Sequence, residues 1–142
     1  MGGGWNDFEA ARIALAKIEL SPGDDALERV LEDATGIIAT ALSVDRVGVW
    51  IFEDDRAQMR CIWQHDAHAS RSNIPVLRAI DYPLYMHALE EHRFIVADDA
   101  LTHPHTRGLR RDYLESLGIT SMLDAPVYRG GEIIRIVCHE QP

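Results

Sequence analysis

Two adjacent glycines, Gly130 and Gly131, separate two runs rich in β-branched and apolar residues near the end of this chain. The runs cover residues 119–128 and 132–140. Glycines in this position supply the positive φ angles of a tight turn, so the pattern predicts a β-hairpin. The second run is nearly continuously apolar over residues 133–137, which is typical of a strand buried on both faces. Such a strand belongs in the middle of a sheet, so other segments must supply flanking strands and covering helices.

The spacing of apolar residues upstream predicts these other elements. Alternation in one predicted strand places Met59, Cys61 and Trp63 on the same face. The predicted strands cover residues 45–53, 58–65 and 93–97, with a short extended piece at 74–77, and the predicted helices cover residues 7–20, 21–42, 83–92 and 107–117.

Residues suited to helix ends mark several of these boundaries. Ser21 is expected to cap the second helix, with Pro22 at its first position. Pro83 suits the first turn of the third. Thr106 is expected to cap the last helix, and Gly118 to end it in a left-handed conformation.

Composition excludes several classes of function. The net charge of -9 argues against broad binding to nucleic acid or anionic membranes, because both require clustered Lys and Arg. Arg107, Arg110 and Arg111 form one small cluster, but Asp112 and Glu115 lie beside them, which indicates a solvated helix face. No apolar stretch reaches the roughly 18 residues of a membrane span, and no signal peptide is evident. We therefore expect a cytoplasmic protein that does not insert into membranes.

Four segments follow one another in order over residues 25–140: VDRVGVWIFEDD, YPLYMHALEEHRFIVADDA, YLESLG, and ITSMLDAP followed by IVCHE. Together they resemble the GAF domain of bacterial sensor proteins of the histidine kinase or diguanylate cyclase type. The resemblance implies an α+β fold with a central antiparallel sheet of five or six strands flanked by helices. It also implies the strand order 2-1-5-4-3, counting the five main strands along the chain.

The resemblance divides the chain into residues 1–22, an N-terminal helix or tag-containing leader, and residues 23–142, a GAF-like sensory domain. In the resembled family a helix usually follows the last strand, and here that helix is absent. We interpret the chain as a fragment of a longer signalling protein or as a short stand-alone module.

The function that the resemblance implies is regulatory. The domain would bind a small ligand of unknown identity and signal to an output domain outside this chain, such as the kinase of a two-component system, and would itself be no enzyme. One alternative is a ligand-free dimerisation module in which the helices of residues 7–42 form a bundle; a homodimer is expected. A weaker alternative is a small redox enzyme that depends on Cys61 or Cys138.

A ligand pocket of this fold lies between one face of the sheet and the helices and loops across it. Aromatic side chains with a few polar groups are the usual lining of such a pocket. The candidate ligand-binding residues are Trp50, Trp63, Tyr82, Tyr85, Met86, Asp98, Asp99, Ser121 and Met122. The aromatic residues among them equally fit an ordinary hydrophobic core.

Cofactor chemistry finds little support in the sequence. Some GAF domains attach a bilin covalently through a cysteine in the region after the short third strand. Here that region, residues 98–117, contains no cysteine, so the resemblance implies no covalent bilin at that site. Metal binding needs three or four converging ligands, whereas the candidate ligands fall into two separate loops, so no metal site is predicted. His87, on a predicted helix over the pocket, is the histidine to test for haem. The candidate metal ligands are His65, Asp66, His68, His103 and His105.

Arg135 departs from the small residues that similar domains carry in the last strand. A buried arginine costs several kcal/mol unless it is paired. We therefore expect Arg135 either to be exposed or to pair with a carboxylate.

Overall fold

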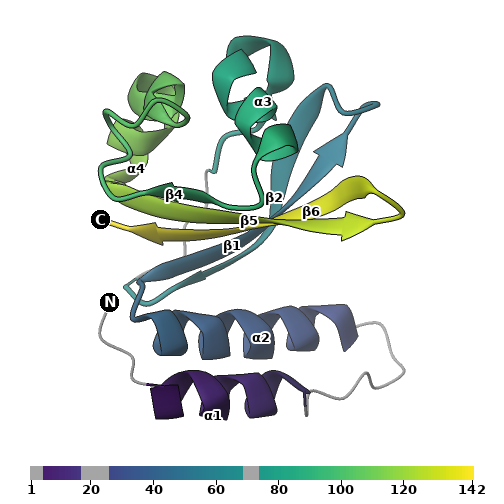
Figure 1. Cartoon of the computed structure of the whole chain (residues 1–142), viewed down its shortest axis with the longest axis vertical. Helices are drawn as coiled ribbons and strands as arrows, with labels where there is room; N and C mark the ends of the chain where they lie inside the picture. The colour runs from purple at the N-terminus through teal and green to yellow at the C-terminus, as the bar shows by residue number, and fades with distance from the viewer. Residues whose placement is uncertain (1–4, 17–25, 69–73) are drawn as a thin grey trace.

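The structure is a computed structural model that describes residues 5–16, 26–68 and 74–142. One twisted antiparallel sheet forms its middle layer, with two long helices on one side and shorter helical segments on the other (Figure 1). The predicted α+β class is confirmed. The strands are β1 (Arg46–Glu53), β2 (Gln58–Asp66), β3 (Leu77–Arg78), β4 (Ile95–Ala97), β5 (Ser121–Arg129) and β6 (Glu132–Gln141), and the helical segments are α1 (Trp5–Ala16), α2 (Ala26–Leu42), η1 (Ala79–Asp81), α3 (Pro83–Glu91), η2 (Arg107–Leu109), η3 (Arg110–Leu114) and α4 (Glu115–Leu117).

The strand order is β3-β2-β1-β6-β5-β4. This confirms the expected arrangement of the five main strands and adds β3 as a short edge strand next to β2. β6 lies between β1 and β5, so the last strand is central as its apolar sequence predicts. Gly130 and Gly131 turn the chain between β5 and β6 with φ angles of 58° and 83°, as the hairpin prediction requires.

A β-bulge in β2 changes which side chains share a face. Val49 is paired with Trp63, but the next residue, Trp50, is paired with Cys61, so Ile62 is the extra residue. The bulge shifts the alternation by one residue. The prediction that Met59, Cys61 and Trp63 share one face is therefore wrong. Met59 and Cys61 belong to the face under α3, whereas the indole Nε1 of Trp63 donates to Thr35 Oγ1 of α2 over 3.1 Å.

The helices α1 and α2 form a separate double layer below the sheet (Figure 1). α2 packs on β1 and β2, and α1 packs on α2. The end of α2 at Leu42 agrees with the sequence. The predicted cap at Ser21 and the last residues of the first predicted helix lie outside the described residues.

The opposite face of the sheet is covered by α3 and by the segment from η2 to α4. α3 begins at Pro83, as predicted. Residues 107–117 are helical but irregular, since a 3₁₀ turn and a π-helical turn precede the single turn of α4. Thr106 makes no helix-capping bond, so that prediction is wrong; its hydroxyl instead donates to the carbonyl oxygen of Ala100 over 2.7 Å. Gly118 ends the segment with a φ of 68°, as expected.

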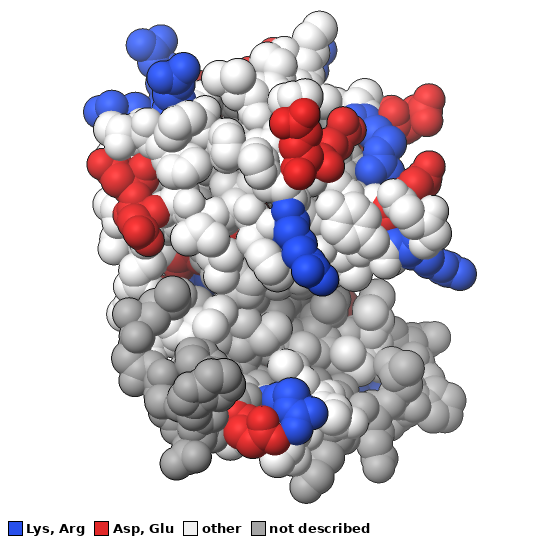
Figure 2. Space-filling model, viewed as in Figure 1, with Lys and Arg blue, Asp and Glu red and all other residues white. Residues whose placement is uncertain are grey.

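Charged side chains lie almost entirely on the surface. Arg135 is exposed, which confirms one of the two expected outcomes for this residue. Arg110 pairs with Glu115 over 2.6 Å, as a solvated helix face would. Figure 2 shows acidic and basic groups interspersed on the visible face, with only a small basic group over α4. Within the described ranges, none of the helices combines the length and the apolar character that crossing a bilayer demands.

Candidate functional site

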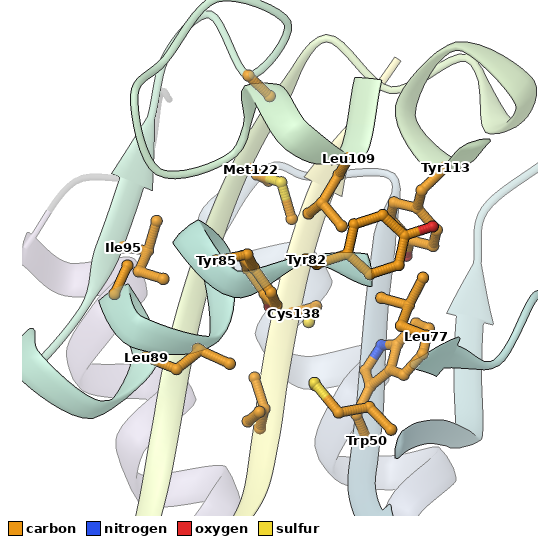
Figure 3. Packing of buried hydrophobic residues seen from close by; sticks show 14 of the residues in the cluster. Trp50, Leu77, Tyr82, Tyr85, Leu89, Ile95, Leu109, Tyr113, Met122 and Cys138 are labelled. Carbon is orange, nitrogen blue, oxygen red and sulfur yellow. The ribbon is translucent and has the colours of Figure 1, made fainter. Parts of the chain in front are cut away.

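The interior between the sheet and the α3–α4 layer is the main hydrophobic core, where side chains from the strands and from the helices across them meet (Figure 3). Trp50 contacts Tyr113 edge to face, with ring centroids 5.8 Å apart. A cavity of about 10 Å³ remains, close to the volume that one water molecule needs. Its lining comprises Trp50, Met59, Leu77, Tyr85, Leu109, Tyr113, Met122 and Cys138.

Asp124 of β5 is fully buried next to Tyr85 and Cys138, which line this cavity, although Asp124 itself is not part of the lining. The hydroxyl of Tyr85, on α3, donates a short hydrogen bond to its Oδ2 atom. Its other oxygen, Oδ1, has no hydrogen-bond partner among the described residues. Burial raises the pKa of Asp124 to about 6, while the hydrogen bond from Tyr85 and the nearby Cys138 thiol act in the opposite direction. A buried carboxylate oxygen without a partner is rare in folded proteins and marks this position as a candidate for binding.

Glu140 of β6 is a second buried carboxylate on the same face. The Tyr113 hydroxyl donates to its Oε2 atom over 2.7 Å. Burial raises the pKa of Glu140 to about 7, and the nearby guanidinium of Arg46 acts in the opposite direction. Arg46 is itself buried. It pairs with Asp66 over 3.0 Å and donates to the carbonyl oxygen of Leu117 over 2.8 Å.

The indole of Trp50 supplies the other unpartnered polar atom. Its Nε1 atom is buried and has no acceptor among the described residues. Gly48 makes room for this ring, because a methyl group added at Gly48 would lie 3.3 Å from Nε1. The core thus contains one free donor and one free acceptor, together with two tyrosine hydroxyls bound to carboxylates.

Neither cysteine is suited to nucleophilic chemistry. Burial raises the pKa of Cys61 to about 11. Burial, followed by the charges of Asp124 and Glu140, raises the pKa of Cys138 well above its ordinary value. Thiolates are the reactive form of cysteine, so both thiols stay protonated and unreactive at neutral pH.

The predicted ligand-binding residues fall into three places. Trp50, Tyr82, Tyr85 and Met122 are buried in the core, and Met86 packs against them. Trp63 faces α2 on the other side of the sheet. The three remaining residues are Asp98, Asp99 and Ser121.

Asp98 and Ser121 line a second cleft of about 580 Å³ at one end of the sheet, next to the end of α2, and Met122 lines both this cleft and the core cavity. His139 also lines it, and its Nδ1 atom donates to the carbonyl oxygen of Leu123 over 2.8 Å. Asp99 instead holds its own loop, since its Oδ1 atom accepts a hydrogen bond from the Leu101 backbone N–H. The structure therefore does not bring all nine residues into one site.

The candidate metal ligands lie apart. His68 pairs with Asp45 over 2.9 Å. His103 and His105 are near each other and near His92, with the rings of His92 and His105 stacked at 4.6 Å. Among the described residues no group of three His, Cys, Asp or Glu side chains is arranged to hold a metal ion. His87, the histidine considered for haem, is largely exposed and pairs with Glu91 over 3.1 Å on the outer surface of α3.

Four residues of the buried polar cluster were missed as site candidates in the sequence: Asp124, Glu140, Tyr113 and Arg46. One signal was present. Asp124 follows Met122 at a spacing of two in an apolar strand, so it shares the core-facing side. A carboxylate at such a position requires either a partner or a function.

The sheet and the helices that cover its two faces define the α+β fold of this chain. A family model for the GAF domain matches residues 26–142. The chain belongs to the GAF family.

Several solved structures share the fold. A GAF domain from a phosphoenolpyruvate-protein phosphotransferase of Coxiella burnetii is 19% identical, with a TM-score of 0.69 over 96% of this chain and 77% of that chain. The phycocyanobilin-bound GAF domain of a cyanobacterial phytochrome is 19% identical, with a TM-score of 0.70 over 97% of this chain and 81% of that one. Residues 122 to 287 of a methyl-accepting chemotaxis protein are 16% identical, with a TM-score of 0.65 over 96% of this chain and 82% of that chain. No curated protein matches the sequence.

Proposed function

We propose that this domain is a regulatory sensor that binds a small ligand in the core between the sheet and α3. GAF domains commonly have sensory or regulatory roles in signalling proteins such as phytochromes and chemotaxis proteins. The observation that carries the proposal is the buried Asp124 carboxylate, which has one unpartnered oxygen and a pKa raised by burial to about 6. Strongly perturbed ionisable groups in a protein interior concentrate at functional sites.

The same contacts provide a route for the signal. Tyr85 connects α3 to β5 through Asp124, and Tyr113 connects η3 to β6 through Glu140. A ligand that competes for Asp124 would change how α3 packs on the sheet. A ligand shifts the populations of two packings only through different affinities for them. In our proposal this shift reaches an output domain outside the chain, such as a histidine kinase or diguanylate cyclase of a cytoplasmic signalling protein.

The proposal is tested by native mass spectrometry of freshly purified protein, with an absorbance spectrum of the same sample. We expect an extra mass on the folded chain that disappears on denaturation. The protein should then be stripped by unfolding and refolding, and the released compound added back. Recovery of the original melting temperature supports ligand binding. A folded chain that carries no extra mass from its native host argues against it.

A second candidate function is homodimerisation through the helices of residues 7–42. Ile13 on α1 and Leu27 on α2 are 44% and 62% exposed, and α1 packs on α2 rather than on the sheet. Burying such apolar side chains in a dimer is favourable. Light scattering across a hundredfold range of concentration distinguishes a dimer from a monomer, and Ile13→Glu should shift a dimer of this kind to monomer. Exposed Ile80 on η1, changed to Glu, is the matched control.

A further inference from the structure

We propose that the core ligand is a small nitrogen compound that presents N–H donors to Asp124, such as an amine, an amidine or a protonated nitrogen heterocycle. This inference rests on the proposed function and specifies its ligand class. It is carried by the buried charges, by the open hydrogen-bonding atoms and by the aromatic lining of the core.

The buried charges near this site are predominantly negative. Asp124 and Glu140 are 0% and 1% exposed, and the Asp66 side chain is 4% exposed. Arg46 is the one buried arginine or lysine among the described residues, and it already bonds to Asp66 and to a backbone carbonyl. An anionic ligand in this core would add to the buried negative charge with no free cation to receive it, whereas a cation would offset that charge.

The open hydrogen-bonding atoms point to the same class. The Tyr85 and Tyr113 hydroxyls already donate to carboxylates, so neither proton is available to a ligand without breaking an existing bond. Asp124 Oδ1 accepts no hydrogen bond from the described residues, and the only donor found beside the carboxylate among them, apart from Tyr85, is the Cys138 thiol, which is a weak donor, so an N–H group would satisfy this oxygen better. Trp50 Nε1 is the one buried side-chain donor left open in the described part of the chain, and it lies over Gly48, which is paired with Cys138 next to Asp124. In our proposal it donates to an acceptor atom of the ligand.

Aromatic faces complete the site. Trp50, Tyr85 and Tyr113 all line the small cavity. Their rings attract cations through the negative potential of the ring face. Because the cavity measures only about 10 Å³, even a small ligand must move a neighbouring side chain. Tyr85 is the side chain most directly affected, since it occupies the other oxygen of the same carboxylate.

The test uses three probes of nearly identical shape: acetamidinium, acetamide and acetate, each at equal ionic strength. Binding is followed by the indole N–H resonance of Trp50 in ¹⁵N-labelled protein and by the melting temperature. We expect acetamidinium to move the Trp50 resonance saturably and to raise the melting temperature. Acetate and acetamide should bind at least tenfold more weakly.

Two variants assign the binding to Asp124. Asp124→Asn keeps the shape of the side chain but removes its charge, and should weaken acetamidinium at least tenfold. The matched control is Asp98→Asn, which changes an exposed carboxylate in the second cleft and should alter the affinity less than twofold. Should Asp124→Asn fail to fold, Tyr85→Phe provides a second variant. It frees Oδ2 and should tighten acetamidinium binding severalfold.

Three results would overturn the inference: acetate or acetamide binding as tightly as acetamidinium, no saturable shift with acetamidinium, or unchanged affinity in Asp124→Asn. The retained-mass experiment separates this failure from failure of the proposed function. A retained carboxylic acid or phosphate ester would leave the sensor function standing and exclude the nitrogen-donor class. No retained mass together with no acetamidinium binding would reject both.

Discussion

The Tyr113 hydroxyl donates a 2.7 Å hydrogen bond to Oε2 of Glu140, and both side chains are almost fully buried. Through this bond the irregular helical segment before β5 is fixed to the central strand β6. The bond also compensates part of the cost of burying a carboxylate.

Removing that hydroxyl should destabilise the domain. We expect Tyr113→Phe to lower the free energy of unfolding by about 1.5–3 kcal/mol, because a buried charged acceptor loses its donor. Tyr128→Phe is the control, since Tyr128 is 47% exposed, and should change stability by less than about 0.5 kcal/mol. Urea denaturation measures both variants. Equal stability of Tyr113→Phe and the parent chain would contradict the importance of this bond.

Stability should depend on pH through the buried carboxylates. The folded-state pKa values of about 6 for Asp124 and about 7 for Glu140 lie above the ordinary values of 3.8 and 4.5 for these groups. The folded state therefore binds more protons than the unfolded state in this range. The contribution of these groups is fully present below about pH 4 and is lost as pH rises through 6 and 7.

Asp124→Asn should remove the part of this pH dependence that Asp124 causes. That part is a change in the free energy of unfolding on the order of 1 kcal/mol between pH 5 and pH 8. The groups that face the two carboxylates are Tyr85, Tyr113, Cys138, Arg46 and Asp66. Burial lowers the pKa of His139, whose contribution has the opposite sign and is lost as pH falls. The free energy of unfolding is therefore measured for the parent chain and for Asp124→Asn at each pH. Parallel curves of this free energy against pH would contradict a contribution from Asp124.

An added side chain should destabilise the domain at Gly131, in the β5–β6 turn, but not at Gly108, in η2. An added methyl group meets no atom within 4 Å at Gly131 or at Gly108, so sterics against neighbours are equal. Gly131 has a φ of 83°, whereas Gly108 is not in the positive-φ region. We expect Gly131→Ala to cost about 1–2 kcal/mol and Gly108→Ala to be neutral or mildly stabilising. Thermal unfolding of the two variants side by side tests this.

The thiols should be inert in the folded protein. Burial raises the pKa of Cys61 from an ordinary value of 9.0 to about 11, so its thiolate fraction at neutral pH falls roughly 100-fold. Cys138 should be slower still, because it is almost fully buried. We expect Ellman's reagent at pH 7.5 to label both thiols in urea and neither on the same timescale in native buffer. Rapid native labelling would revive the redox alternative.

Much of this fold is predictable from local sequence. The glycine pair fixes the β5–β6 turn, and Pro83 and Gly118 mark helix boundaries that the structure reproduces. The β2 bulge is not predictable in this way. Its extra residue, Ile62, is neither a glycine nor a proline, so the local sequence does not indicate a bulge. Only the pairing of β2 with β1 shows that Trp63 faces away from the core.

The candidate site is less predictable than the fold. Large aromatic residues predict a hydrophobic core, and Trp50 and Tyr85 are buried in it. What distinguishes this core is the partner of each polar atom, which depends on tertiary contacts between α3 and β5 and between η3 and β6. Of these polar residues, only Asp124 was predictable from the sequence, because it is a carboxylate on the core-facing side of an apolar strand.

The central position of β6 has a consequence for how the chain folds. The β1–β2 and β5–β6 hairpins each join neighbouring segments, but the sheet becomes continuous only when β1 pairs with β6, with Arg46 opposite Glu140. Closing so long a loop has a large entropic cost and slows folding. During synthesis on the ribosome, β1 can therefore pair with β6 only after the last strand has been made. Until then the edge of β1 is open to pairing with other chains.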